Sequence, residues 1–324
     1  MRRGKRRSVV ALIACAMLIM VSCTKEKGCQ ECTFTSIESF IIGADGVKYL
    51  STNDGLFSFS EKGWKKLSGL EENGILGDLA FGPDNSLWAA TEKGVLNSEA
   101  DTLITKETGG LISNSVHFLD IDSDYNMFFA TPEGVSVLFQ GQWFDTTGRD
   151  EMFLHAQISD IASASNGYTY VSTNGGGVGR FHTDIDGITG ATLFDTDWTS
   201  LRSNNVSTVF IDDTIQWYGT DKGIAIHYSE YTKWDWSNLR TYDGLISDTV
   251  ISIVKDGAGN MWFGTVKGLS RYDGENWSNY TRQSDMLLSD TVEFMAVDPE
   301  GAIWIAGPDG LTQFIANEFI HFLK

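Results

Sequence analysis

The chain has few of the residue types that usually mark a chemical centre. Its four cysteines stand at positions 15, 23, 29 and 32, so no thiol site can lie in the long remainder of the sequence. Only four prolines occur in 324 residues, which excludes a proline-rich linker. No two of the five histidines have the spacing of metal ligands: His117, His155, His182, His227 and His321. We therefore expect no metal and no cofactor.

Basic residues are also scarce. Lys and Arg number 24 against 43 Asp and Glu, which gives a formal net charge of −19. The five basic residues of the first 22 positions are Arg2, Arg3, Lys5, Arg6 and Arg7, and without them the charge is −24. Such a surface repels phosphate backbones and anionic lipids. We expect no nucleic-acid partner, and no membrane contact except through a lipid anchor.

Sequence signatures of hydrolytic and phosphate-binding sites are missing. No Gly-x-Ser-x-Gly motif occurs, and the many carboxylates are too dispersed to nominate a glycosidase pair. The glycine-rich run Asn174–Gly179 opens no predicted helix, so a phosphate loop is not expected. Asp256 and Trp262 resemble the Asp-box of sialidases, but their gap is one residue longer and no arginine cluster accompanies them. A structural turn is the better interpretation.

The N-terminal segment has the pattern of an export signal. A basic stretch is followed by the apolar run Val9–Val21, which is shorter than the roughly 20 residues of a membrane span. Met20-Val21-Ser22-Cys23 resembles a bacterial lipoprotein signal, in which Cys23 is lipidated and becomes the first mature residue. The alternative is an ordinary signal peptide with an incidental cysteine. We predict a signal peptide over 1–22 and a tether over 23–32, in which Cys29 and Cys32 form a local disulfide. The protein is then exported and lipid-anchored at the outer membrane or cell surface.

An aromatic residue recurs seven times at a spacing close to 40 residues. It is followed after three residues by Thr or Gly and after three more by Gly, as in Trp262-Phe-Gly-Thr265-Val-Lys-Gly268. The aromatics are Tyr49, Trp88, Phe128, Tyr170, Trp217, Trp262 and Trp304, at intervals of 39, 40, 42, 47, 45 and 42 residues. A period near 40 with about four short strands per copy is typical of a propeller blade. We predict an all-β fold over 33–324, a seven-bladed β-propeller with four antiparallel strands per blade.

The clearest copy predicts its own strands. They are expected over 250–254, 261–265, 269–272 and 277–281, separated by turns rich in Gly, Asn and Asp. The predicted blades are 33–68, 69–107, 108–147, 148–197, 198–242, 243–283 and 284–324. The chain opens with a predicted inner strand (37–42) and closes with an outer one (318–323), so closure should rest on packing alone. The aromatic should wedge between blades and the Gly should serve a tight turn.

The sixth copy, from Gly244-Leu-Ile-Ser-Asp-Thr-Val250 to Tyr272-Asp-Gly, resembles the two-component regulator propeller repeat. The third copy matches through Gly110–Val116 and the fifth through Trp217–Thr220, and the resemblance extends over about residues 35–320. It implies an extracytoplasmic propeller, often the sensor of a membrane-bound histidine kinase, and a glycan-derived ligand. The sequence shows one propeller without the Ig-like module, second span or kinase of those receptors, so direct signalling is not implied.

One set of side chains could form a ligand site. The segment leading into each inner strand repeats a polar residue two positions before a buried Val, namely Asn114, Asn204, Asp248 and Asp290. These segments should gather around the channel mouth, which makes the following residues candidates for ligand binding: Phe153, His155, Trp198, Arg202, Asn204, Tyr242, Asp248 and Asp290. Rings beside Asn, Asp and Arg suit sugar recognition. Alternatively, the Asn and Asp side chains cap the turns by bonding to the backbone.

Three functions are compatible with these features. The first is a non-enzymatic surface or periplasmic lipoprotein that binds or senses a small molecule or oligosaccharide. The second is a propeller enzyme, a lyase or glycosidase, with its site in the channel mouth, which a mutually facing acid/base pair would favour. The third is a scaffold that docks another protein, which a broad flat apolar patch would favour.

Overall fold

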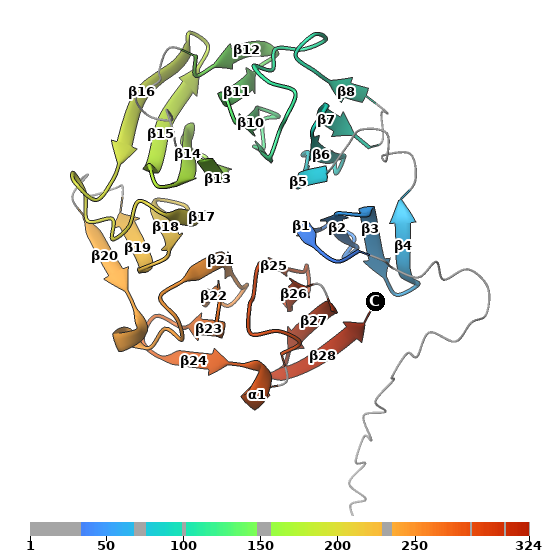
Figure 1. Ribbon diagram of the computed structural model, residues 1–324, viewed down its shortest axis with the longest axis vertical. Helices are drawn as coiled ribbons and strands as arrows, with labels where there is room; N and C mark the ends of the chain where they lie inside the picture. The colour runs from blue at the N-terminus through green and yellow to red at the C-terminus, as the bar shows by residue number, and fades with distance from the viewer. Residues whose placement is uncertain are drawn as a thin grey trace, which may run out of the picture.

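Seven four-stranded antiparallel sheets make up the fold. The computed structural model describes residues 34–67, 76–98, 102–147, 157–228, 235–285, 287–307 and 309–323. Within each sheet the four strands follow one another in chain order, and Figure 1 shows the sheets arranged around a common axis. The predicted seven-bladed β-propeller is therefore confirmed.

Within each blade the four strands follow one another from the central channel to the outer edge. Blades 1 and 2 contain β1 (Ile37–Ile42), β2 (Lys48–Thr52), β3 (Gly55–Ser60), β4 (Gly63–Leu67), β5 (Leu76–Phe81), β6 (Leu87–Thr91), β7 (Gly94–Asn97) and β8 (Thr102–Ile104). Blades 3 and 4 contain β9 (Phe118–Ile121), β10 (Met127–Thr131), β11 (Gly134–Phe139), β12 (Gln142–Asp145), β13 (Gln157–Ser163), β14 (Tyr168–Asn174), β15 (Gly177–Asp184) and β16 (Gly187–Phe194). Blades 5 and 6 contain β17 (Val206–Asp212), β18 (Ile215–Thr220), β19 (Gly223–Tyr228), β20 (Trp236–Leu239), β21 (Val250–Lys255), β22 (Met261–Thr265), β23 (Gly268–Tyr272) and β24 (Trp277–Tyr280). Blade 7 contains β25 (Phe294–Val297), β26 (Ile303–Gly307), β27 (Gly310–Ile315) and β28 (Glu318–Leu323).

Two short helical turns interrupt this pattern. The 3₁₀ turn η2 (Thr241–Asp243) lies between blades 5 and 6, and α1 (Arg282–Asp285) lies between blades 6 and 7. Among the described residues, no helix is long and apolar enough to cross a membrane.

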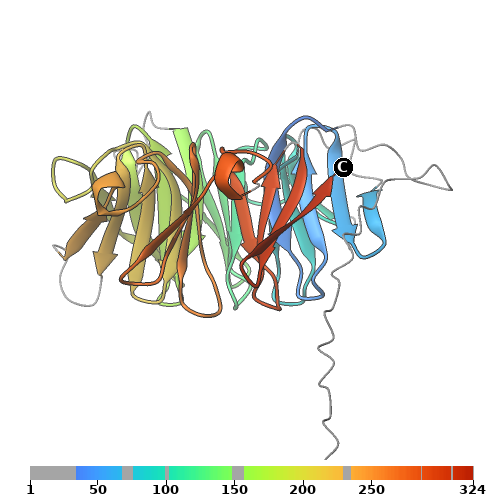
Figure 2. The same cartoon turned by 90° about the horizontal axis from the view of Figure 1, so that it is seen from below.

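The connections between strands define two faces of the disc seen edge-on in Figure 2. Because the strands of a blade alternate in direction, the loops from one blade to the next lie on the same face as the turns between second and third strands. We call this face the connecting face, and its blade-to-blade segments the connecting loops. Backbone bonds hold the two sets together, since Gly175 and Gly177 of blade 4 both donate to the Asn204 carbonyl at 2.9 Å.

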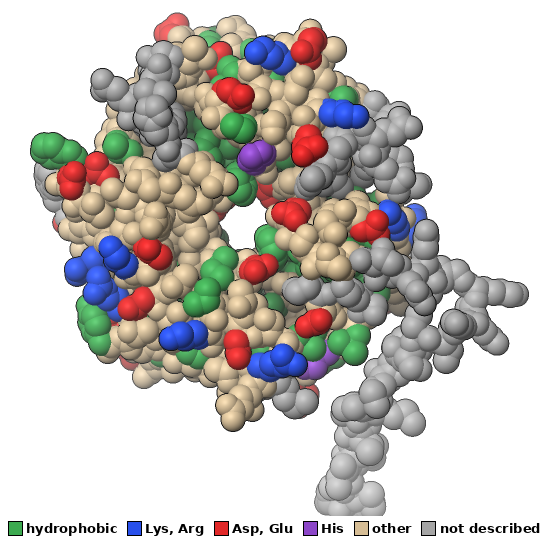
Figure 3. Space-filling model, in the orientation of Figure 1, with side chains coloured by type: hydrophobic (Ala, Val, Ile, Leu, Met, Phe, Trp, Pro, Cys, Tyr) green, Lys and Arg blue, Asp and Glu red, His purple; other side chains and the backbone are tan. Residues whose placement is uncertain are grey.

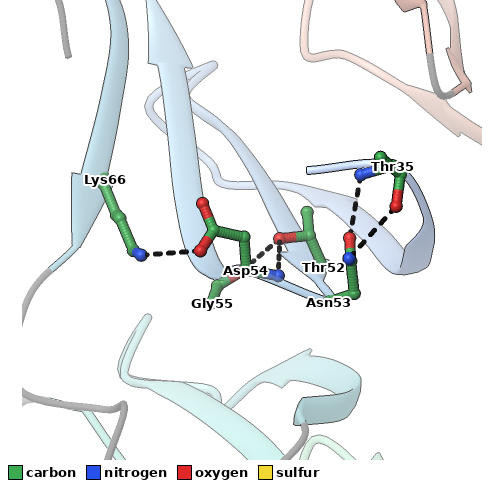
Figure 4. Close-up of polar contacts among 6 residues, drawn as sticks. All are labelled: Thr35, Thr52, Asn53, Asp54, Gly55 and Lys66. Carbon is green, nitrogen blue, oxygen red and sulfur yellow. Dashed lines mark hydrogen bonds and ion pairs between the residues drawn. The ribbon is translucent and has the colours of Figure 1, made fainter. Parts of the chain in front are cut away.

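The repeated Thr and Gly build the turn between second and third strands. In Figure 4, Thr52 Oγ1 donates to the Gly55 carbonyl oxygen at 2.7 Å and accepts the Asp54 N–H at 3.2 Å. In blade 6 the corresponding Gly268 has φ +135°, and a Cβ there would lie 2.3 Å from the Tyr280 carbonyl oxygen. Glycine is the residue that tolerates both conditions, as predicted.

The repeated aromatic fills the space between neighbouring blades. Trp262 is 2% exposed and packs in one cluster with Met295 and Ile305 of blade 7, while its Nε1 donates to Asp256 Oδ2 at 2.9 Å. The rings in blades 3, 4, 5 and 7 are also buried. Trp88 and Tyr49 depart from the prediction because both remain partly exposed. The wedge is therefore complete in five blades and partial in two.

Among the described residues, no strand is exchanged where the ring closes. Blade 1 is β1 to β4 and blade 7 is β25 to β28, so the seam joins the two ends of the propeller by side chains. Phe59 lies 5.2 Å from Phe322 and 6.3 Å from Trp304, measured between ring centroids. Lys48 Nζ lies 3.9 Å from the Trp304 ring centroid, and Trp64 Nε1 donates to the Leu323 carbonyl. This is the predicted closure by packing.

Candidate functional site

The repeated Asn and Asp residues tie down the connecting loops. Asn204 Oδ1 accepts the Thr196 N–H at 2.9 Å, and Asp248 Oδ1 accepts the Thr241 N–H at 2.8 Å. In two further connecting loops, the Lys106 N–H donates to Asn114 Oδ1 and the Arg282 N–H donates to Asp290 Oδ1, each at 2.6 Å. Each side chain thus spans seven or eight residues of its loop. This geometry fits the alternative in which the Asn and Asp side chains cap the loops by bonding to the backbone.

Trp198 projects from an ordered loop. Asp195 Oδ1 accepts the N–H groups of Asp197 and Trp198 at 3.0 and 2.9 Å, and Thr199 Oγ1 donates to the Asp195 carbonyl at 2.6 Å. Asn238 of β20 donates to the Ser200 carbonyl at 3.3 Å, which ties this loop to blade 5. The backbone is therefore held while the indole side chain remains 73% exposed.

Tyr242 stands in the middle of η2. The Arg240 N–H donates to Asp243 Oδ2 at 2.9 Å, and the Asp243 N–H donates back to the Arg240 carbonyl at 2.9 Å. Gly244 ends the turn at φ +125°, and a Cβ there would collide with the Trp277 side chain at 2.4 Å. Tyr242 is 74% exposed, so this second ring is also presented by a fixed backbone.

Trp198 and Tyr242 occupy the same position of the repeat. Each lies six residues before the capping side chain, Asn204 in one loop and Asp248 in the next. The corresponding residues of the other two capped loops are Thr108 and Ser284. Two consecutive connecting loops therefore carry an exposed ring where the repeat otherwise has a small polar residue. Counting back from the capping residues would have revealed this equivalence in the sequence.

Arg202 also departs from the repeat. It is exposed on the Trp198 loop, two residues before Asn204, where the other capped loops have Ile112, Ile246 and Leu288. In blade 6 the side chain at that position packs against the turn between second and third strands, since a Cβ built on Gly268 would lie 3.1 Å from Ile246 Cδ1. An arginine at this position adds a positive charge to the connecting face near Trp198.

The remaining predicted residues divide into two groups. Asn204, Asp248 and Asp290 lie on the connecting loops of blades 5, 6 and 7 with the hydrogen bonds given above. Phe153 and His155 lie outside the described residues, as does Cys23. The structure thus brings Trp198, Arg202, Asn204, Tyr242 and Asp248 onto neighbouring loops of one face.

The central channel is open, as Figure 3 shows. Glu38 and His117 stand near the connecting-face end of β1 and β9, and both are exposed. Glu38 Oε1 accepts a bond from Ser36 Oγ at 3.0 Å, and His117 Nε2 lies 3.2 Å from Ser115 Oγ. Neither bonds to the other or to another carboxylate among the described residues. No group of three His, Cys, Asp or Glu in the described ranges is placed to hold a metal.

Blade 7 carries a shallow pocket on the connecting face. In six blades the Thr of the turn donates its hydroxyl to the Gly carbonyl, but blade 7 has Gly307 at that position. The depression there is lined by Leu287, Ser289, Thr291, Asp309 and Thr312 among others. The lost Thr side chain accounts for part of this space.

Comparisons with known proteins support the propeller family over one repeat. Residues 244–267, in blade 6, match the family described as Two component regulator propeller. The predicted resemblance to that repeat is therefore confirmed. A comparison with curated proteins found no match.

Solved structures share the fold at low sequence identity. The extracellular domain of a putative one-component system from B. thetaiotaomicron is 18% identical with a TM-score of 0.67, covering 87% of this chain and 38% of that one. The extracellular domain of a putative hybrid two-component system from the same organism is 17% identical with a TM-score of 0.56, covering 89% and 51%. Virginiamycin B lyase from Staphylococcus aureus is 12% identical with a TM-score of 0.63, covering 85% and 92%. The chain spans about half or less of the two extracellular domains, and these likenesses show the fold.

Proposed function

We propose that this propeller is a non-enzymatic, exported lipoprotein that binds a ligand on its connecting face. The observation that carries the proposal is the pair of rings at one repeat position, Trp198 and Tyr242, exposed by 73% and 74% on neighbouring fixed loops. Exposed aromatics that a scaffold does not require are typical of binding surfaces, because loops on a rigid scaffold carry function. The likeness to extracellular domains of regulators supports export and sensing.

The chemistry of the face favours a neutral or weakly acidic ligand with flat apolar surfaces, such as an oligosaccharide. A ring presents a π face for stacking, and the two loops need no ordering on binding, which lowers the entropic cost. Arg202 offers a forked donor to paired oxygens. The net charge of −19 repels a polyanion before it arrives.

The test is binding of an oligosaccharide array to the protein lacking residues 1–32. The key variant combines Trp198→Thr, Tyr242→Ser and Arg202→Ile, which places the residues of other capped loops at these positions. We expect this variant to fold and to lose array signals by about tenfold or more, as truncation of interface anchors does. The matched control is Ile185→Ser, which removes a 63% exposed side chain from the β15–β16 turn on the opposite face. Equal array signals for wild type and the triple variant would place the site elsewhere.

The lipid anchor has its own test. Cys23→Ser should leave the precursor uncleaved and unlipidated, because the thiol is the acceptor in a lipoprotein signal. Cys29→Ser should be cleaved and lipidated like the wild type. Metabolic labelling with a fatty-acid analogue, followed by membrane fractionation, checks both variants. Label that persists in Cys23→Ser would contradict the anchor.

A further inference from the structure

Trp198 stands at the outer rim of the connecting face. Its loop follows β16, the outer strand of blade 4. Two residues after Trp198, the Ser200 carbonyl accepts a bond from Asn238 Nδ2 at 3.3 Å, and Asn238 belongs to β20, the outer strand of blade 5. Figure 1 shows β16 and β20 on the outside of the ring. The indole is therefore presented between the outer edges of two blades.

Tyr242 stands at the equivalent place one blade further on. Its turn follows β20, and two residues after Tyr242 the Gly244 carbonyl accepts a bond from Asn279 Nδ2 at 2.9 Å. Asn279 lies on β24, the outer strand of blade 6, at the register position that Asn238 has on β20. The same bond thus fixes both loops to the outer strand of the following blade.

The two aromatic rings are separated by the width of blade 5. Equivalent positions of neighbouring blades are one-seventh of a turn apart around the propeller axis. An outer strand lies three strand spacings from the inner one, or roughly 14 Å, before the radius of the channel is added. Two points at that distance from the axis, one-seventh of a turn apart, are separated by at least about 12 Å. The exposures of 73% and 74% agree with this separation, since neither ring covers the other.

Blade 5 presents polar side chains between the two rings. Its outer strand ends at Leu239, and the partly exposed Arg240 follows on the connecting face. Arg240 Nε is buried and has no hydrogen-bond partner among the described residues. At the β18–β19 turn of the same blade, Asp221 Oδ2 accepts a bond from Asn205 Nδ2 at 3.1 Å, and Lys222 is exposed. Hydrogen-bonding groups therefore lie between two isolated aromatic rings.

This arrangement favours a chain of sugar units as the ligand. An aromatic ring stacks on the apolar face of a sugar, and the Lys and Arg side chains between the rings can donate to its hydroxyls. A single sugar is no larger than the indole on which it stacks, so it contacts one ring at a time. A protein partner fits less well, because the core of a protein interface is a continuous apolar patch.

We propose that the connecting face binds a linear oligosaccharide along the outer rim of blade 5, with Trp198 stacked on one sugar unit and Tyr242 on another several units away. Arg240 and Lys222 bind hydroxyls of the units in between. The inference rests on the proposed function and narrows its ligand class to extended chains. Single sugars and compact small molecules bind weakly, because they reach only one ring.

Such a site has a characteristic dependence on chain length. Once one ring holds the chain, contact with the second ring is intramolecular and occurs at a high effective concentration. The affinity should therefore rise in a step at the chain length that first reaches both rings. Removing either ring should abolish the step and leave the affinity for shorter chains nearly unchanged.

The experiment is calorimetric titration of the purified full-length protein with oligomers of one to eight units. The probes are β-1,4-, β-1,3- and α-1,4-linked glucose and β-1,4-linked mannose. For at least one linkage we expect Kd to fall by about tenfold or more at one chain length. Trp198→Thr and Tyr242→Ser, which introduce residues of other capped loops, should each remove this step.

Three control variants separate the rings from the fold. Trp198→Tyr and Tyr242→Trp keep an aromatic ring at each position and should keep the step. Ile185→Ser, on the opposite face, should keep it as well. Urea midpoints equal to that of the wild type confirm that every variant is folded.

The outcomes distinguish this inference from the proposed function. Equal Kd values for short and long chains, with binding lost in the triple variant, would overturn the extended site and retain the ligand face. A step that persists in both Trp198→Thr and Tyr242→Ser would place the chain elsewhere and overturn the inference. A panel in which no chain binds would overturn it too, whereas the proposed function fails only when the triple variant keeps its array signals.

Discussion

At the scale of single residues, the interface between blades 4 and 5 is unusually polar. Tyr170 and Arg180 of blade 4 face Tyr218 and His227 of blade 5, where the fold elsewhere packs aliphatic and aromatic side chains. The Tyr218 hydroxyl is buried and has no hydrogen-bond partner among the described residues. Burial raises its pKa well above the usual value, so it stays a neutral phenol. A buried hydroxyl without a partner costs free energy that a phenyl ring would not.

We therefore predict that Tyr218→Phe stabilises the protein by about 1 kcal/mol. Blades 3 and 6 already have Phe129 and Phe263 at this position, so the ring is compatible with the blade. Tyr170→Phe is the matched control and should destabilise, because the Arg180 side chain interacts with the Tyr170 hydroxyl. Urea midpoints measure both. A loss of stability in Tyr218→Phe would show that its hydroxyl has a partner in solution.

The wedge aromatics should differ in their contribution to stability. We predict that Trp262→Ala lowers the free energy of unfolding by about 3–5 kcal/mol, since it leaves a cavity and removes one hydrogen bond from the Asp256 carboxylate. Trp88→Ala should cost less, because that ring is partly exposed and its Nε1 bonds only to Ser86. Denaturant midpoints rank the two, and equal losses would mean that the wedge does not depend on burial.

At the scale of the structural element, the turn between second and third strands is the most uniform part of the blade. Six turns use a Thr hydroxyl as both donor and acceptor, and blade 7 replaces it with Gly307. Gly307 pairs with Gly310 as Thr265 pairs with Gly268, so the register of the two strands is the same. Among the described residues other than its chain neighbours, no heavy atom lies within 4 Å of a Cβ built on Gly307.

Gly307→Thr should consequently stabilise the propeller by about 1 kcal/mol, through the added hydroxyl bonds and the lower entropy of the unfolded chain. Thermal unfolding at fixed pH measures the shift. Gly264→Thr is the contrasting variant and should destabilise, because a Cβ there meets Ser252 Oγ at 2.2 Å and the Val292 carbonyl oxygen at 2.4 Å. A destabilised Gly307→Thr would indicate that the pocket needs to stay empty.

The elements were more predictable than the site. The first and last strands match their predicted bounds because Gly and Asn turns punctuate an alternating pattern, and β22 matches because Thr265 and Gly268 mark its end. Trp198 and Arg202 could be selected because the repeat does not require them. The capping bonds of Asn204 and Asp248 could not be predicted from the sequence, because an Asn or Asp at this position is compatible both with capping and with ligand binding. The bonds of Asp78 to Ser39 and of Asp160 to Thr208, each on a neighbouring blade, could not be predicted either, because a bulge in each of their strands decides which side chain turns toward the next blade.

At the scale of the whole molecule, the seam is the one interface without a covalent connection. Inner strands elsewhere are joined by polar bonds such as Ser252 Oγ to the Val292 carbonyl, at 3.2 Å. The seam instead depends largely on rings, with Phe59 of blade 1 lying 5.2 Å from Phe322 and 6.3 Å from Trp304 of blade 7, measured between ring centroids. A ring closed by packing should open first at this interface, because no chain holds its two sides at high effective concentration.

Phe322→Ala should therefore loosen blades 1 and 7 selectively. The substitution removes the ring that contacts Phe59 of blade 1 and Trp304 of blade 7, so we expect faster amide exchange in β1 to β4 and β25 to β28, with blades 3 to 5 unchanged. Tyr280→Ala is the matched control, because Tyr280 occupies the same outer-strand position and contacts Phe314 across the covalently connected interface of blades 6 and 7. Native-state hydrogen exchange resolves the blades separately. Faster exchange spread evenly over all seven blades in Phe322→Ala would mean that the ring opens only as a whole, and the seam would then be no weaker than its neighbours.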